Sequence, residues 1–431
     1  MLKRLLRSLA LTLAATSAVA QIKLPVAPLS QPLGTLDRQV DDVASRSLST
    51  LNQVRQREID QLVRDNRRRI DTDLHGNPIV RGEVLAWSPT EAALAHAKGL
   101  GFAITREQSI ESLHVQVVVL GAPNGVATRK ALKMLREGDP DGSYDFNHIY
   151  LQSAAQFTPG GGATAPSAGG PARDEVGEHI RIGLLDTGIN LHHPVLDSAH
   201  IVQWGCDGKP VAAAHGTAIA SILIGHAPDF HGVQPGAELY SADVYCGQPV
   251  GGAVDSIVGA LAWLVGQNIP VINVSLVGPA NFLLEHTIAA LSARGFLIVA
   301  AVGNDGPAAA PLYPASYPRV VGVTAVDARQ HVLIEAAHGP QVMFASPGAD
   351  MAAADGGTGY SSVRGTSFAS PIVAALLAGR ISAPDPGQVT AAIDALAKTA
   401  LDLGSPGRDL TYGFGVVGAE YRMDPGNLVR R

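Results

Sequence analysis

The spacing of apolar and polar residues divides the chain into segments with different expected structures. Between Leu36 and Asp73, apolar residues recur at steps of three to five positions among many charged residues. This spacing predicts an amphipathic helix or helix pair. The basic run from Arg64 to Arg69 is interrupted by one Asp and one Asn, and we interpret it as a solvated face of this segment.

From residue 79 to residue 151, strand-like runs alternate with helical ones. The expected order is β-α-β-β-α-β, the ferredoxin-like arrangement of a small α+β domain. Helices would cover one face of its sheet and leave the other free to dock on a partner. The expected strands are 80–87, 102–106, 114–120 and 144–151, and the expected helices are 92–98 and 127–136.

From His179 onward, short apolar runs alternate with helical segments. This alternation predicts an α/β domain whose mostly parallel sheet is covered by helices on both faces. Functional residues in such sheets gather at the carboxyl ends of the strands. The expected strands are 182–185, 237–245, 271–276, 296–302 and 320–326, with helices at 218–225, 253–267, 282–294, 367–378 and 387–397.

The first twenty residues have the pattern of a secretory signal peptide. A basic start is followed by a short apolar core and by the small residues Ala18-Val19-Ala20, which are typical of a cleavage site. We therefore expect an exported protein, either periplasmic or secreted. An uncleaved membrane anchor is the alternative, and only in that case would a membrane be a partner.

Composition narrows the classes of function. With 46% hydrophobic and 16% charged residues, the chain is expected to be a well-buried globular protein. A net charge of −6 and few aromatic residues argue against nucleic acid as a partner. Cys206 and Cys246 are the only cysteines, and export favours a disulfide between them over two free thiols.

Four polar residues lie within two positions of a glycine at the ends of predicted elements. Asp186 lies in LLDTGIN, His215 in HGTAIAS, Asn304 in AAVGNDG and Ser367 in GTSFASP. Each alone has an ordinary explanation as a turn former or helix cap. Together they could supply a nucleophile at a helix start, a base, an orienting acid and an oxyanion donor.

The order Asp186, His215, Asn304, Ser367 resembles that of the subtilisin-like serine proteases. The resemblance covers about residues 179–417 and includes His193-Pro194, YPASYP at 313–318 and YGFG at 412–415. It implies a subtilisin-like catalytic domain at 176–422 and a tail at 423–431. By this resemblance Ser367 is the nucleophile, His215 the base and acid, and Asp186 the residue that orients His215. The Asn304 side chain and the Ser367 N–H would bind the oxyanion.

The resemblance also implies that substrate binds as an extended strand along Ser275, Leu276, Val277 and Gly278. Members of the family commonly carry Gly at the position of Val277 and Ala at that of Val302. Together with Leu312, these side chains would narrow the primary pocket, so we expect a small apolar residue such as Ala before the scissile bond. The remaining expected binding residues are Ala301 and Gly303.

The segment 79–153 resembles the inhibitory and chaperone-like propeptides of the same family. The resemblance implies an intramolecular inhibitor, joined to the catalytic domain by a flexible linker at 154–175 and cut between about Leu151 and Arg173. Segment 21–78, a linker with the amphipathic helical part, has no role that the sequence indicates. The expected partners are thus a peptide or protein substrate and the propeptide.

Two other functions compete with a protease. One is a catalytically silent subtilisin-like regulator that binds a peptide or partner protein, which the complete Asp-His-Asn-Ser set argues against. The other is a lipase or esterase, which would have a G-x-S-x-G motif and the order Ser, Asp, His. We expect no required cofactor and no metal: some family members bind calcium, but Asp350 and Asp355 are scattered and form no EF-hand-like run.

Overall fold

A computed structural model describes residues 55–111, 115–153, 156–159 and 180–427. The chain divides into two compact units, Met1–Arg46 and Ser47–Arg431. All of the first unit, with the expected signal peptide, lies outside the described residues, and so does most of the expected linker. Within the described residues, no helix is both long and apolar enough to span a membrane.

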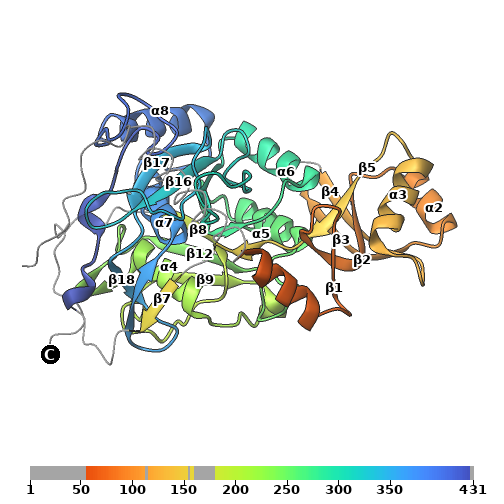
Figure 1. Cartoon of the computed structure of the whole chain (residues 1–431), viewed down its shortest axis with the longest axis horizontal. Helices are drawn as coiled ribbons and strands as arrows, with labels where there is room; N and C mark the ends of the chain where they lie inside the picture. The colour runs from red at the N-terminus through yellow and green to blue at the C-terminus, as the bar shows by residue number, and fades with distance from the viewer. Residues whose placement is uncertain (1–54, 112–114, 154–155, 160–179, 428–431) are drawn as a thin grey trace, which may run out of the picture. The chain divides into compact units, whose positions relative to one another are not determined.

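The larger part of the described chain is built on a seven-stranded parallel sheet (Figure 1). Six of the strands are mostly buried, as expected when both faces of a parallel sheet are covered, whereas the edge strand β9 is only half-buried. The α/β prediction is therefore confirmed, although the two edge strands β9 and β17 were not expected. In sheet order the strands are β17 (Val342–Pro347), β16 (Val321–Val326), β15 (Leu297–Ala301), β13 (Val271–Val274), β8 (Arg181–Asp186), β12 (Glu238–Asp243) and β9 (Ile201–Trp204).

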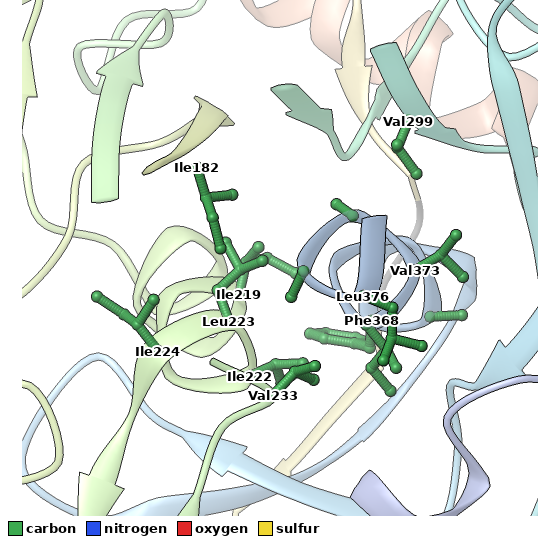
Figure 2. Close-up of a cluster of buried hydrophobic side chains, with 14 of the residues drawn as sticks. Ile182, Ile219, Ile222, Leu223, Ile224, Val233, Val299, Phe368, Val373 and Leu376 are labelled. Atoms are coloured by element: carbon green, nitrogen blue, oxygen red, sulfur yellow. The ribbon is translucent and has the colours of Figure 1, made fainter. Parts of the chain in front are cut away.

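Two helices, α4 (Ala214–Ile224) and α7 (Thr366–Ala378), pack against one another on the same side of this sheet. Figure 2 shows their contact, in which Ile219 and Leu223 of α4 lie near Phe368 of α7, with Ile182 of β8 close by. Every residue of α7 is buried. Side chains at the starts of these helices are consequently held in the rigid interior of the protein.

The opposite side of the sheet is covered by α5 (Val254–Gly266) and α6 (Phe282–Ala293). A further helix, α8 (Pro386–Ala397), contacts α7. Shorter strands form small sheets at the edges of this domain. They are β10 (His226–Ala227) with β11 (Phe230–His231), β14 (Leu276–Val277) with β6 (Leu151–Gln152), and β18 (Met351–Ala354) with β19 (Tyr360–Arg364) and β7 (Gln156–Pro159).

The segment before the large domain has the predicted β-α-β-β-α-β order. Its antiparallel strands pair as β5-β2-β4-β3, and a short additional strand, β1, pairs with the start of β2. The elements are β1 (Ile70–Thr72), β2 (Pro78–Trp87), α2 (Glu91–Gly99), β3 (Ala103–Ile110), β4 (Val115–Gly121), α3 (Thr128–Gly138) and β5 (Ser143–His148).

Strict alternation along β2 and β4 buries both faces of this small sheet. Val84 and Val118 pack in one apolar cluster with residues of α2 and α3. Leu85 and Val119 belong to another cluster, which contains residues of α5 and α6. The face that the sequence left free to dock is therefore packed against helices of the same chain.

Two expectations for the connecting segments are wrong in part. Helix is present at residues 55–65, but β1 replaces the helix expected up to Asp73. Residues 156–159, expected in a flexible linker, form β7. β1 is held by a local hairpin, in which Thr72 lies opposite Pro78 of β2. β7 instead pairs with β19, about 200 residues further along the chain, which local periodicity cannot reveal.

Cys206 and Cys246 are joined by a disulfide. They lie just beyond the carboxyl ends of β9 and β12, which are neighbours in the sheet. The bond thus ties together two loops at the edge of the sheet where Asp186 also lies.

Candidate active site

Asp186 and His215 form a buried pair at the carboxyl edge of the sheet. Asp186 ends β8, and His215 is the second residue of α4. Nδ1 of His215 lies 2.8 and 2.9 Å from the two carboxylate oxygens of Asp186. Because a carboxylate accepts, Nδ1 is the donor, which leaves Nε2 as the basic nitrogen of the ring.

Thr187 fixes both halves of this pair. Its N–H donates to Asp186 Oδ1 at 2.7 Å, and its Oγ1 accepts from the N–H of Gly216 at 2.9 Å. A Cβ on Gly216 would lie only 2.4 Å from the Thr187 carbonyl oxygen. The glycine after His215 is therefore required for α4 to approach the end of β8 this closely.

Ser367 is the second residue of α7 and is fully buried. The helix starts at Gly365, whose φ of 141° favours glycine. The N–H groups of a first helical turn have no intrahelical acceptor, so they are available to an oxyanion. Oγ of Ser367 donates to the carbonyl oxygen of Ser153 at 3.2 Å.

Asn304 lies beside this contact with a defined amide orientation. Its Oδ1 accepts from the N–H of Thr366 at 3.0 Å, and its Nδ2 donates to Oγ of Ser153 at 2.8 Å. Oγ1 of Thr366 also accepts from the N–H of Gly303 at 3.2 Å. Thr366, which sequence reasoning missed, thus orients the strand end that carries Asn304. Its only sequence signal was its place between Gly365 and Ser367.

The residues that lead up to Ser153 form a strand between two backbone edges, β14 and residues 252–253. We call the space between these two edges the cleft. β6 pairs antiparallel with β14, with Gln152 opposite Leu276 and Leu151 opposite Val277. The N–H of Ser153 points at the Ser275 carbonyl oxygen, 3.4 Å away. The edge predicted to bind peptide therefore binds residues of the chain itself.

A second edge, which the sequence analysis missed, lies on the other side of this strand. The N–H of Tyr150 donates to the Gly252 carbonyl oxygen at 2.8 Å, and Ile149 pairs with Ala253. The sequence signal for this edge was the pair Gly251-Gly252. Beyond Ser153, β7 pairs with β19, the strand that leads into α7. The chain therefore occupies the cleft on both sides of Ser367.

Among the other expected binding residues, Gly278 and Gly303 make close contacts. A Cβ on Gly278 would lie 2.7 Å from the ring of the fully buried Tyr150, and one on Gly303 would lie 2.5 Å from Cδ1 of Leu312. Ala301 ends β15 and is fully buried. Val302 packs into the apolar cluster shared with α5 and α6, so core packing accounts for its size.

The described residues contain one group of three potential metal ligands, Cys206, Asp243 and Cys246. Its two sulfurs are bonded to each other, and the Asp243 carboxylate accepts N–H groups of Val211, Tyr245 and Cys246. This donor set stabilises a turn and does not fit a calcium site, which requires six to eight oxygen ligands. The prediction that no cofactor is required stays a prediction.

Comparisons with known proteins agree with this geometry. A family model described as the subtilase family matches residues 177–415. An alkaline protease of Alkalihalobacillus alcalophilus is 32% identical over 294 residues, covering 66% of this chain and 74% of the relative. Subtilisin BL of Lederbergia lenta is 32% identical over 276 residues, covering 62% of this chain and 98% of the relative.

A likeness in fold extends further along the chain. The crystal structure of fervidolysin from Fervidobacterium pennivorans aligns with a TM-score of 0.67 over 80% of this chain and 61% of that chain. Its sequence identity of 18% supports the fold alone. The family match and the two relatives carry the assignment: this chain belongs to the subtilase family and is a serine endopeptidase.

Proposed function

We propose that Ser367, His215 and Asp186 are the catalytic triad, with Asn304 and the Ser367 N–H as the oxyanion hole. Oγ of Ser367 attacks the substrate carbonyl carbon while Nε2 of His215 takes its proton. Asp186 keeps the proton of His215 on Nδ1 and stabilises the imidazolium. His215 then gives the proton to the leaving amine, and water hydrolyses the acyl-enzyme by the same steps.

The observation that carries this proposal is the 3.2 Å contact between Ser367 Oγ and the Ser153 carbonyl oxygen. This carbonyl belongs to a strand held by backbone hydrogen bonds on two edges, as in recognition of an extended peptide. Nδ2 of Asn304 contacts Oγ of the same residue. A small movement of Nδ2 would bring it to an oxyanion formed at Ser153.

We further propose that the chain is an exported, self-inhibited precursor that cuts its own Ser153–Ala154 bond. Residues 79–153 are the propeptide, and the enzyme begins at Ala154. In this reaction the Ser153 acyl group passes to Ser367 Oγ, the Ala154 amine receives the proton from His215, and water releases the Ser153 carboxyl group. A disulfide at Cys206 and Cys246 is consistent with an oxidising compartment.

N-terminal sequencing of the protein secreted by the wild type tests this processing, with Ser367→Ala as the comparison. We expect Ala154 as the new terminus in the wild type, and a precursor lacking only its signal peptide in Ser367→Ala. An active wild type that keeps residues 55–153 covalently attached would contradict the maturation proposal.

The buried Ser153 also supports a preference for small residues before the scissile bond. Its side chain is fully buried, with Oγ 2.8 Å from Nδ2 of Asn304 and 3.3 Å from Oγ1 of Thr366. We expect Ser153→Ala to be processed normally and Ser153→Phe to remain uncut. A peptide library read by mass spectrometry provides the independent measurement, and a profile dominated by Phe or Tyr at that position would rule the preference out.

A fluorophosphonate probe separates the proposed mechanism from that of a silent regulator. The probe forms a covalent bond with an activated serine, so labelling of Ser367 after removal of the propeptide supports the triad. Absence of labelling in the mature protein would support the regulator instead.

A further inference from the structure

Residues 55–73, which we call the N-terminal strap, precede the propeptide domain and lie against the candidate active site. Arg55, Ile59, Leu62 and Val63 share one face of the helix at 55–65, because they are spaced by four, seven and eight positions from Arg55. Ile59 on this face is only 3% exposed. The intervening polar residues Gln56, Arg57, Glu58 and Asp60 are exposed.

This apolar face covers the strand that occupies the cleft. Leu62 and Val63 pack in one cluster with Ile149 and Leu151 of that strand. The same cluster contains Ala253, from the second peptide-binding edge. The strap therefore packs both against the strand that lies in the cleft and against Ala253, which belongs to one edge of the cleft.

An ion pair joins the start of the strap to the residue after Asn304. Nε of Arg55 lies 3.1 Å from Oδ2 of Asp305, and their side chains are 17% and 8% exposed. Burial raises the pKa of Asp305, and the charge of Arg55 opposes that rise. Removing Arg55 would leave a desolvated carboxylate without its counter-ion, which is strongly unfavourable.

The far end of the strap is anchored as well. Nε2 of His148, just before the cleft strand, lies 3.3 Å from Oδ2 of the buried Asp73. Arg69 donates to Oε1 of Gln248 at 3.0 Å, on the catalytic domain. The strap is thus tied at both ends, with the cleft strand beneath it.

We propose that the strap is a second inhibitory lock, which acts in addition to the propeptide domain and is joined to its sheet through β1. It retains residues 149–153 in the cleft after the Ser153–Ala154 bond is cut, so that activity appears only when the strap leaves. This inference rests on the proposed function. It gives a role to a segment for which the sequence indicated none.

The test compares full-length Arg55→Ala with wild type and with Arg57→Ala, a matched control on the exposed side of the same helix. Bond cleavage is followed by gel, and peptidase activity is followed separately with a peptide substrate. We expect equal cleavage rates but a lag before activity that is about tenfold shorter in Arg55→Ala, since loss of one buried charge partner acts on dissociation. Arg57→Ala should behave as wild type. All three yield the same mature chain, so their final activities must agree.

A second measurement is independent of activity. In the Ser367→Ala background, hydrogen exchange at the amides of Tyr150 and Ser153 should be about tenfold faster with Arg55→Ala, but unchanged with Arg57→Ala. Leu62→Ser should act as Arg55→Ala does. If Arg55→Ala and Leu62→Ser change neither the hydrogen exchange at Tyr150 and Ser153 nor the lag before peptidase activity, the strap is not an inhibitory lock. A wild type that neither cuts itself nor reacts with fluorophosphonate would instead refute the proposed function, and the exchange result would still decide whether the strap holds the strand.

Discussion

At the scale of single residues, the amide of Asn304 has only one useful orientation. Its oxygen is engaged by the N–H of Thr366, so its two N–H donors must face the cleft. That constraint comes from the same helix that carries Ser367, which links the position of the proposed oxyanion donor to that of the proposed nucleophile. The amide is therefore preorganised before a charge develops.

This orientation predicts the effect of Asn304→Ala. Cleavage of the Ser153–Ala154 bond within one chain is a single-turnover reaction, and its first-order rate should fall about 10²–10³-fold, as is usual for a lost oxyanion donor. Asn304→Asp has nearly the same size but presents only acceptors, so it should be at least as slow. A rate within a factor of about two of wild type in Asn304→Ala would exclude the assigned role.

At the scale of elements, the turn between β1 and β2 is held by one carboxylate. Oδ1 of Asp73 accepts from the N–H groups of His75 and Asn77, and Oδ2 accepts from the side chains of Asn77 and His148. Burial raises the pKa of Asp73, but the hydrogen bonds from His148 and Asn77 outweigh it and hold the pKa well below its usual range.

The lowered pKa of Asp73 predicts a pH dependence. An Asp whose pKa is lower in the folded than in the unfolded protein stabilises the fold above the unfolded value of about 3.9, and this contribution is lost as the pH falls below it. The melting temperature of the Ser367→Ala precursor should therefore drop between about pH 5 and pH 3. In Asp73→Asn the decrease in melting temperature over this pH range should be smaller. An equal decrease would show that Asp73 does not cause the pH dependence.

A second contact between elements joins the small antiparallel domain to α5. Arg106 in β3 contacts Glu83 of β2 and Asp255 in the first turn of α5, at 2.7 and 2.8 Å. Asp255 also accepts from the side chain of Asn147 at 2.9 Å. The Asp255 side chain is only 4% exposed, so it depends on these partners.

Replacing Arg106 by Ala should therefore loosen the domain contact. Because the Arg106 side chain is 45% exposed, water screens part of the charge that is lost, and we expect about 1–2 kcal/mol lower stability of the Ser367→Ala precursor by urea unfolding. Lys133→Ala, which removes only an exposed pair with Glu137, is the control and should change stability by less than about 0.5 kcal/mol.

At the scale of the whole molecule, the small antiparallel domain that we propose as the propeptide shares an apolar core with the large domain. Leu85, Ile110 and Val119 pack in the same apolar cluster as α5 and α6, which themselves cover one face of the parallel sheet. A parallel sheet requires long crossover connections, so its contacts form late and slowly. The small antiparallel domain has shorter connections and can offer a preformed surface to those helices.

This packing predicts that the mature chain refolds more slowly than the precursor. With Ser367→Ala in both, residues 154–431 diluted from urea should regain native circular dichroism at least about tenfold more slowly than the precursor. Val119 lies on the face of the small domain toward α5 and α6. Val119→Asp in the precursor should therefore reduce the difference in refolding rate between the precursor and residues 154–431. Equal refolding rates of all three proteins would show that the small domain does not speed the folding of the large domain.

The sequence by itself determined most of the main strands and helices of this protein and the class of its chemistry, a serine protease. Its apolar runs predict a buried parallel sheet because such strands are covered on both faces, and its glycine-flanked Asp186, His215, Asn304 and Ser367 predict a site at the carboxyl edge. The alternation in 79–151 likewise predicts a sheet with one face on helices. These features are local, so periodicity and turn chemistry are sufficient to find them.

Only the tertiary structure decided what fills the cleft. Ser153 lies in no sequence motif that indicates a function. Its carbonyl oxygen reaches Ser367 because β6 and β7 pair with strands more than a hundred residues away in the chain. Arg55 and Asp305 are 250 positions apart, and their contact depends on how the strap crosses the cleft. Long-range pairing and burial carry no local signal. The sequence therefore predicts a propeptide, but it indicates neither the bond at which we propose that it is cut nor the strap that we propose as its lock.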